Sequence, residues 1–209
     1  MIAALLFGAG AVFALIYQIQ GAGDDAPSRG ASTAKTTATG CLTLAALTCG
    51  APGLIILGLA LGMAGDYVLT RPAPSAFLAG MAAFAAGHLA YAAWMFTPEH
   101  ADRLIWALPL IALALSAEWW LLPRTGSLHG PVRAYIWVIS LMGAAALSLP
   151  QAAWPAQIGA ALFILSDLLL ALRLFVVAAP QVRQLLARLL WPAYWIGQAL
   201  ILAGTVRAA

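Results

Sequence analysis

Long apolar segments alternate with short polar ones along almost the whole chain, and most are close to 20 residues long. A helix needs ~20 mostly apolar residues to cross the hydrocarbon core of a membrane, whereas barrel strands would give shorter, alternating segments. We therefore predict an all-α fold, a polytopic membrane bundle of eight transmembrane helices. The spans are expected at residues 1–20, 36–50, 53–70, 75–96, 103–122, 131–149, 154–177 and 189–206.

The polar stretches between these segments predict loops. Residues 21–35 are rich in Gly, Ser, Thr and Asp and are expected to form a loop, which leaves a short, threonine-rich second span. Arg71-Pro72-Ala73-Pro74 predicts a tight turn. The first segment lacks the basic start of a signal peptide, so it is expected to stay as a span. Residues 1–209 are expected to form a single domain.

Composition supports a membrane protein. The chain is 64% hydrophobic and 8% charged, whereas a soluble domain carries about 25% charged residues. The net charge is +3, but Lys and Arg form no dense cluster of the kind that binds nucleic acid. We therefore expect membrane lipids as the surroundings and no nucleic-acid partner. The sequence leaves the oligomeric state open.

The charged loops predict an orientation. Cytoplasmic loops of membrane proteins carry an excess of Lys and Arg, so the loops after the odd-numbered spans are expected in the cytoplasm and both termini outside it. We expect this arrangement in a bacterial inner membrane. The opposite side holds Arg103 and Arg207, whereas the odd-numbered loops hold Arg29, Lys35, Arg71, Arg124, Arg133, Arg183 and Arg188.

Two aspartates lie within apolar segments, Asp167 midway along residues 154–177 and Asp66 near the end of residues 53–70. A charged side chain in lipid costs ~2.5–3.5 kcal/mol on insertion scales, so such residues usually face a protein interior and mark function. At ~1.5 Å per residue, Asp66 falls within ~6 Å of the cytoplasmic helix end and Asp167 at ~13–15 Å. We predict that the two aspartates meet in one cavity open to the inner leaflet.

Further polar residues could line the same cavity, and each also has a simpler explanation. Either aspartate could be a structural carboxylate, and a lone histidine is often a hydrogen-bonded core residue. Lys35 could extend to the membrane surface or contact a phosphate. His88 is the only histidine well inside a predicted span, so a three-histidine zinc site is hard to build, and we expect no metal or other cofactor. The candidates besides the aspartates are Lys35, His88, Tyr91, Tyr135, Ser166, Tyr194 and Gln198.

The order and spacing of these residues resemble the YhhN family of membrane proteins, which includes the lysoplasmalogenases. Lys35 corresponds to a lysine before the family's second span, although threonine rather than proline follows it here. The resemblance covers nearly the whole chain. It is carried by Gly65, Asp66, Phe77, Gly80, Phe84, His88, Tyr91, Pro131, Val132, Tyr135, Phe163, Ser166, Asp167, Ala171, Phe175, Tyr194 and Gln198.

The resemblance implies hydrolysis of the vinyl ether bond of lysoplasmalogens, giving a fatty aldehyde and a glycerophospho-ethanolamine or -choline. Such a reaction needs a carboxylic acid, an anion beside the developing cation and a base for water. We expect Asp167 as the acid, because burial favours the neutral form of a carboxyl group, and Asp66 as base and cation stabiliser. These two labels could be exchanged.

The remaining candidates are expected to bind the lysophospholipid. His88, Tyr91, Tyr194 and Gln198 would orient water and substrate, and Tyr135 and Ser166 would contact the substrate. Lys35 and Arg71 would hold its phosphate. Two alternatives remain open from the sequence: a non-catalytic lipid-binding or proton-coupled transport protein, and a related lysolipid hydrolase that cleaves an ester or amide.

Overall fold

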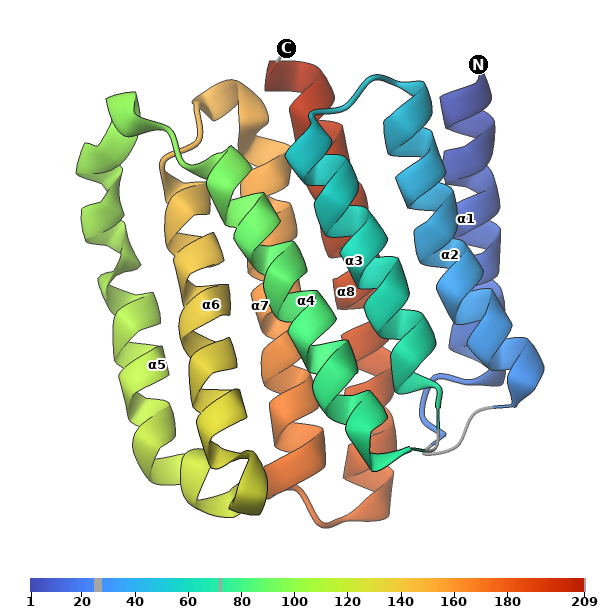
Figure 1. Cartoon of the computed structure of the whole chain (residues 1–209), viewed down its shortest axis with the longest axis vertical. Coiled ribbons are helices and arrows are strands. Elements are labelled where there is room, and N and C mark those ends of the chain that lie inside the picture. The colour runs from blue at the N-terminus through green and yellow to red at the C-terminus, as the bar shows by residue number, and fades with distance from the viewer. Residues whose placement is uncertain (25–27, 72, 209) are drawn as a thin grey trace.

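A computed structural model describes residues 1–24, 28–71 and 73–208, apart from the side chains of residues 74 and 206–208. Over these ranges it contains eight α-helices and no β-strand. Consecutive helices run in opposite directions, and both termini lie at the same end of the bundle (Figure 1). The helices are α1 (Ile2–Gln20), α2 (Arg29–Thr48), α3 (Gly53–Leu69), α4 (Pro74–Met95), α5 (Leu108–Trp120), α6 (His129–Leu147), α7 (Trp154–Ala171) and α8 (Pro180–Ala208).

Hydropathy and length support membrane crossing by six of the helical segments in the described ranges. Helix α3 is apolar but has only 17 residues. Helix α2 is not among the six, because its threonines, serine and lysine lower its hydropathy. The all-helical prediction is therefore confirmed, whereas eight membrane spans remain a prediction.

The polar stretch before the predicted second span is partly helical, so the loop expected over residues 21–35 is wrong for its last seven residues. Helix α2 begins at Arg29, and the Ser28 hydroxyl accepts a hydrogen bond from the Ala31 amide at 3.2 Å. The Thr33 and Thr36 hydroxyls donate to carbonyls one turn earlier, at 2.9 and 3.2 Å. These polar side chains are thus satisfied inside a helix. Lys35 consequently points from a helix rather than from a loop.

Two other boundaries differ from the expectation. Helix α8 begins at Pro180 rather than at Leu189, because the polar residues of its first turns are compatible with a helix as well as with a loop. The fifth predicted span begins within a 3₁₀ helix, η1 (Pro98–Ala107). The seventh predicted span, residues 154–177, is covered by α7 and by the short π-helix η5 (Leu172–Val176) that follows it. Pro72 of the predicted turn and the Arg207 side chain lie outside the described residues.

Glycines let the helices that carry the candidate residues approach closely. A Cβ atom added at Gly58 of α3 would lie 2.3 Å from the Tyr91 ring of α4. A Cβ atom at Gly159 of α7 would lie 2.5 Å from the Gly197 carbonyl oxygen of α8. Small residues at such interfaces are a common means of packing membrane helices. They bring α3 against α4, and α7 against α8.

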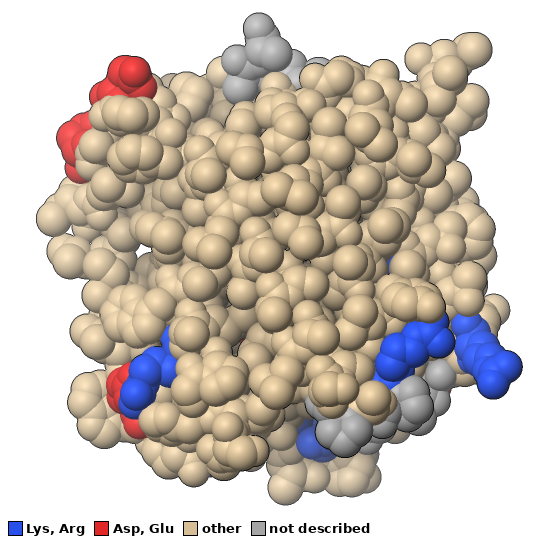
Figure 2. All heavy atoms as spheres, viewed as in Figure 1, with Lys and Arg blue, Asp and Glu red and all other residues tan. Residues whose placement is uncertain are grey.

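Basic residues gather at the end of the bundle opposite both termini. On the face shown in Figure 2, the Lys and Arg atoms all lie in the lower half, and both termini lie at the top of the same view in Figure 1. Helices α2, α4, α6 and α8 begin at this end. Here we call it the basic end.

Candidate active site

A cavity of about 340 Å³ lies between the helices and reaches toward the basic end. Gly23 and Asp24 follow the end of α1, Thr70 follows the end of α3, and with Lys35 and Arg173 they form the part that we call the mouth. An apolar arm extends between α5 and α6. Its lining includes Leu110, Leu113, Ala114, Ala117, Ile136 and Ile139. Asp66 and Asp167 both line the cavity, together with Tyr135, Ser166 and Tyr194.

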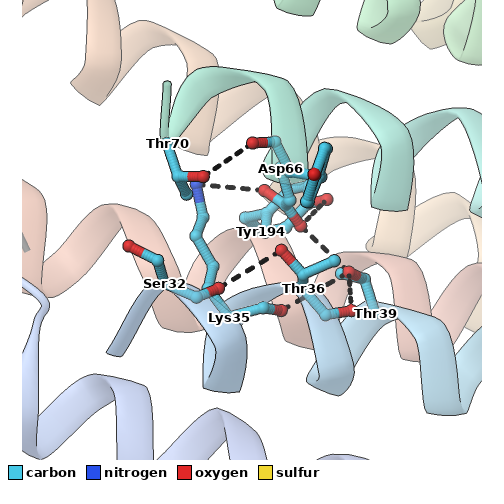
Figure 3. Close-up of polar contacts among 8 residues, drawn as sticks. Ser32, Lys35, Thr36, Thr39, Asp66, Thr70 and Tyr194 are labelled. Carbon is cyan, nitrogen blue, oxygen red and sulfur yellow. Dashed lines mark hydrogen bonds and ion pairs between the residues drawn. The ribbon is translucent and has the colours of Figure 1, made fainter. Parts of the chain in front are cut away.

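Asp66 is fully buried and surrounded by donors from two helices, α2 and α8 (Figure 3). The Lys35 ammonium of α2 lies 3.0 Å from Asp66 Oδ1. The Tyr194 hydroxyl of α8 donates to Oδ2 at 2.8 Å, and the Thr39 hydroxyl of α2 donates to the same oxygen at 3.1 Å. This set of donors is complementary to an ionised carboxylate.

Sequence reasoning missed three residues around this carboxylate. Thr39 was not singled out, although it lies one helical turn after Lys35 and therefore shares its face. The Lys35 ammonium also lies 5.9 Å from the ring centres of Tyr17 and Trp191, within the range of a cation–π interaction. These two rings come from α1 and α8, and nothing in the sequence pairs them with Lys35.

Asp167 has a separate set of partners, from α4 and α6. The Tyr135 hydroxyl donates to Oδ2 at 2.7 Å, and His88 Nε2 lies 3.2 Å from the same oxygen. His88 Nε2 and the Tyr135 hydroxyl are themselves 3.5 Å apart, so the three groups form a connected cluster. Among the described residues, no partner contacts Asp167 Oδ1, which remains available for a ligand or a proton.

The two carboxylates share the cavity, but each is held by its own partners and they do not contact each other directly. The Phe163 ring packs edge-on against the rings of His88 and Tyr194, with distances between ring centres of 4.5 and 5.2 Å. It therefore connects the two clusters. The expected order of burial is reversed. The Asp66 side chain is 1% exposed and the Asp167 side chain 16%, because α2 and α8 close over the end of α3.

Three of the expected ligand-contacting residues lie behind the cavity wall. His88, Tyr91 and Gln198 are at most 1% exposed, and none of them is among the described residues that line the cavity. The Tyr91 hydroxyl donates to Gln198 Oε1 at 3.3 Å, which joins α4 to α8. Their position suits residues that hold others in place.

Ser166 and Arg71 also differ from the expected arrangement. Ser166 lines the cavity, but its buried hydroxyl donates to the Phe163 carbonyl at 2.8 Å. Arg71 lies over the exposed ring of Tyr67, 4.0 Å from its centre, and does not line the cavity. Arg71 is therefore poorly placed for the phosphate contact that was expected of it.

The site can hold one carboxylate as an anion and offer a second one to a ligand. Within the described ranges, no three His, Cys, Asp or Glu side chains are grouped as a metal site would require. The polar groups occupy one part of the cavity and apolar side chains the other. This division suits an amphipathic ligand with a single chain.

Comparisons with known proteins identify the relatives of this chain at the level of a family. No curated protein and no solved structure matches it. The model of the YhhN family matches residues 30–205, which include α3 to α7 and every candidate site residue discussed above apart from Tyr17, Gly23 and Asp24. The chain therefore belongs to the YhhN family.

Proposed function

We propose that the protein hydrolyses the vinyl ether bond of lysoplasmalogens, by acid–base chemistry at Asp66 and Asp167. The observation that supports this most strongly is the pair of carboxylates in one cavity, each with a different environment. Two carboxyl groups in different protonation states can supply the acid and the base that vinyl ether hydrolysis needs. The apolar arm would accommodate the single alkenyl chain.

The reaction begins with proton transfer from Asp167 to the β-carbon of the vinyl ether. Tyr135 and His88 contact Oδ2, so the transferred proton would be carried by Oδ1. The substrate becomes an oxocarbenium ion and Asp167 becomes a carboxylate. Tyr135 and His88 then stabilise the new negative charge by hydrogen bonding to it.

Asp66 would remain ionised beside Lys35 and act on water. Water adds to the oxocarbenium carbon and gives one proton to Asp66, forming a hemiacetal. In its collapse, the protonated Asp66 returns a proton to the departing glycerol oxygen, and the hemiacetal hydroxyl gives its proton to Asp167. The carbon–oxygen bond to glycerol breaks, the aldehyde is released and both carboxyl groups recover their initial states.

The buried residues behind the wall would position the catalytic groups. His88 holds Asp167 through its 3.2 Å contact, and Phe163 keeps the His88 ring in place. Gln198 and Tyr91 fix α8 against α4, and therefore fix the Tyr194 hydroxyl that reaches Asp66. None of these roles requires direct contact with the substrate.

We also propose that the basic end faces the cytoplasm of a bacterial inner membrane, with both termini on the other side. The gathering of Lys and Arg at the end opposite the termini supports this orientation (Figure 2). The cavity mouth would then open toward the cytoplasmic leaflet, where a lysolipid could enter with its headgroup near the basic residues.

The test is an assay of aldehyde release by purified protein supplied with a lysoplasmalogen. The wild-type protein should release aldehyde, and Asp66→Asn and Asp167→Asn should each abolish turnover while the protein stays folded. Glu118→Gln is the matched control, because Glu118 pairs with Arg133 at the surface of α5 and does not line the cavity. Turnover retained in both aspartate variants would contradict the scheme.

The buried Asp–Lys pair also supports a second candidate, a proton-coupled lipid transporter. Ionisable residues inside a membrane bundle mark proton pathways as well as catalytic sites. Transport would appear as lipid movement in proteoliposomes that depends on a proton gradient, without release of aldehyde. A panel of lysolipids that differ only in the sn-1 linkage would identify a hydrolase for esters or amides instead.

A further inference from the structure

The mouth of the cavity contains an arginine that the catalytic scheme does not use. Among the described arginines, Arg173 is the one that lines the cavity, and it is partly buried. The other cations that were expected to contact phosphate are placed differently. Lys35 lies against the Asp66 carboxylate, and Arg71 lies outside the cavity over Tyr67.

The backbone around Arg173 is held in an unusual conformation. Arg173 belongs to the π-helix η5, which directly follows α7, and π-helices are rare in proteins. Three consecutive residues of this turn, Arg173, Leu174 and Phe175, line the cavity. Arg183 Nη1 donates to the Arg173 carbonyl at 2.9 Å, which ties the start of α8 to this turn.

The position of Arg173 suits the polar part of a lysolipid. It follows Asp167 by six residues, about 9 Å along a helix axis, and its side chain can cover much of that distance. Asp24 also lies at the mouth, and Arg173 Nη2 contacts its carbonyl oxygen at 3.4 Å. In a glycerophospholipid the phosphate is attached two glycerol carbons away from the carbon that bears the sn-1 oxygen, so a substrate bound at Asp167 would place it toward the mouth.

We propose that Arg173 binds the phosphodiester of the lysolipid headgroup and so selects substrates that carry a phosphate. This inference rests on the proposed function, because it takes Asp167 as the place of the sn-1 linkage. A guanidinium group can donate two parallel hydrogen bonds to phosphate oxygens, which a lysine cannot do. The binding energy would hold the glycerol at the mouth while the alkenyl chain lies in the apolar arm.

The experiment compares two substrates that differ in the phosphate alone, a lysoplasmalogen and the corresponding 1-alkenylglycerol. In the wild-type protein kcat/KM should be higher for the lysoplasmalogen, and in Arg173→Ala the ratio of the two values should fall at least about tenfold. In Arg173→Lys the ratio should lie between that of the wild type and that of Arg173→Ala. Arg71→Ala, which removes a cation from the same end but outside the cavity, should leave the ratio as it is.

A binding measurement separates this proposal from the proposed function. The ligands are a lysophospholipid with a stable alkyl ether at sn-1 and the matching alkylglycerol, with tryptophan fluorescence as the signal, because Trp120 and Trp191 line the cavity. If the wild-type protein prefers the phospholipid and Arg173→Ala does not, the headgroup site stands even if no aldehyde is ever released. Equal loss for both ligands, or no preference in the wild type, would overturn it.

A last arm tests the source of the phosphate. Glycerophosphoethanolamine should compete with the alkyl lysophospholipid, and this competition should depend on Arg173. At the same concentrations, inorganic phosphate should compete no more strongly than chloride. Arg173-dependent competition by inorganic phosphate at lower concentrations than by glycerophosphoethanolamine would assign the site to free phosphate and overturn the headgroup proposal.

Discussion

The Lys35 ammonium lies 3.0 Å from Asp66 Oδ1 inside the bundle. This contact joins α2, which hydropathy does not identify as a membrane span, to α3, which ends at the basic end. The Lys35 side chain is 17% exposed and that of Asp66 only 1%. Each charge is therefore compensated mainly by the other. The pair gives the polar helix α2 a contact with α3 inside the structure.

Removing Lys35 alone should destabilise the protein far more than removing both members of the pair. Lys35→Met leaves the Asp66 carboxylate buried without its cation, and such losses cost ~3–5 kcal/mol. Lys35→Met combined with Asp66→Asn should recover most of that stability, since no uncompensated charge remains. Thermal unfolding in detergent of the wild type, both single variants and the double variant would measure the coupling. Additive effects of the two substitutions would argue against a coupled pair.

The Tyr135 hydroxyl should matter for turnover more than for stability. Tyr135→Phe removes the 2.7 Å hydrogen bond to Asp167 Oδ2 and keeps the ring that packs beside His88. A hydrogen bond to a charged group contributes ~1.5–3 kcal/mol, so kcat should fall ~10–100-fold if the bond strengthens as Asp167 becomes a carboxylate. Tyr67→Phe, at an exposed tyrosine, is the control. An unchanged kcat would show that the Tyr135 hydroxyl has no part in the reaction.

The contact of α3 with α4 should tolerate no side chain at Gly58. Gly58→Ala would place a Cβ atom 2.3 Å from the Tyr91 ring, which is 1% exposed and held by Gln198. Overpacking of this kind costs ~1–3 kcal/mol, and displacement of Tyr91 should disturb the position of Gln198. Gly8→Ala in α1, where nothing lies within 4 Å of the added atom, should leave unfolding unchanged. Equal thermal stability of the two variants would contradict the tight contact.

The apolar arm should determine which chain lengths are accepted. Ala114→Phe would fill the arm, because Ala114 is buried and lines the cavity from α5. We expect kcat/KM to fall most for long alkenyl chains and least for short ones. Leu115→Phe places the same ring on the next residue of the helix, which is 45% exposed and does not line the cavity. A uniform loss across a series of chain lengths would place the alkenyl chain elsewhere.

Much of the fold could be predicted because membrane helices depend on local sequence. Apolar segments near 20 residues long must satisfy their backbone polar groups internally, so they form helices whatever surrounds them. The same reasoning failed at α2 and at the start of α8. There polar side chains are satisfied within the helix or by neighbouring helices, and hydropathy alone cannot distinguish such a segment from a loop.

The candidate residues could be named from the sequence, but their partners could not. Asp66 and Asp167 are conspicuous because a carboxylate is costly in lipid. That Lys35 and Tyr194 belong to Asp66, and His88 and Tyr135 to Asp167, depends on how six helices pack. Helix packing also decided that Asp66 is more deeply buried than Asp167, because the depth of a residue along its own helix does not show which neighbouring helices cover it.

The sequence by itself thus determined a helical membrane chain with two acidic side chains in its apolar segments, because hydrophobic length and the cost of a buried charge are properties of single segments. Only the tertiary structure decided that these side chains line one cavity with separate donors, and that Arg173 rather than Arg71 reaches its mouth. Contacts between distant helices follow from shape and close packing, which hydropathy does not record.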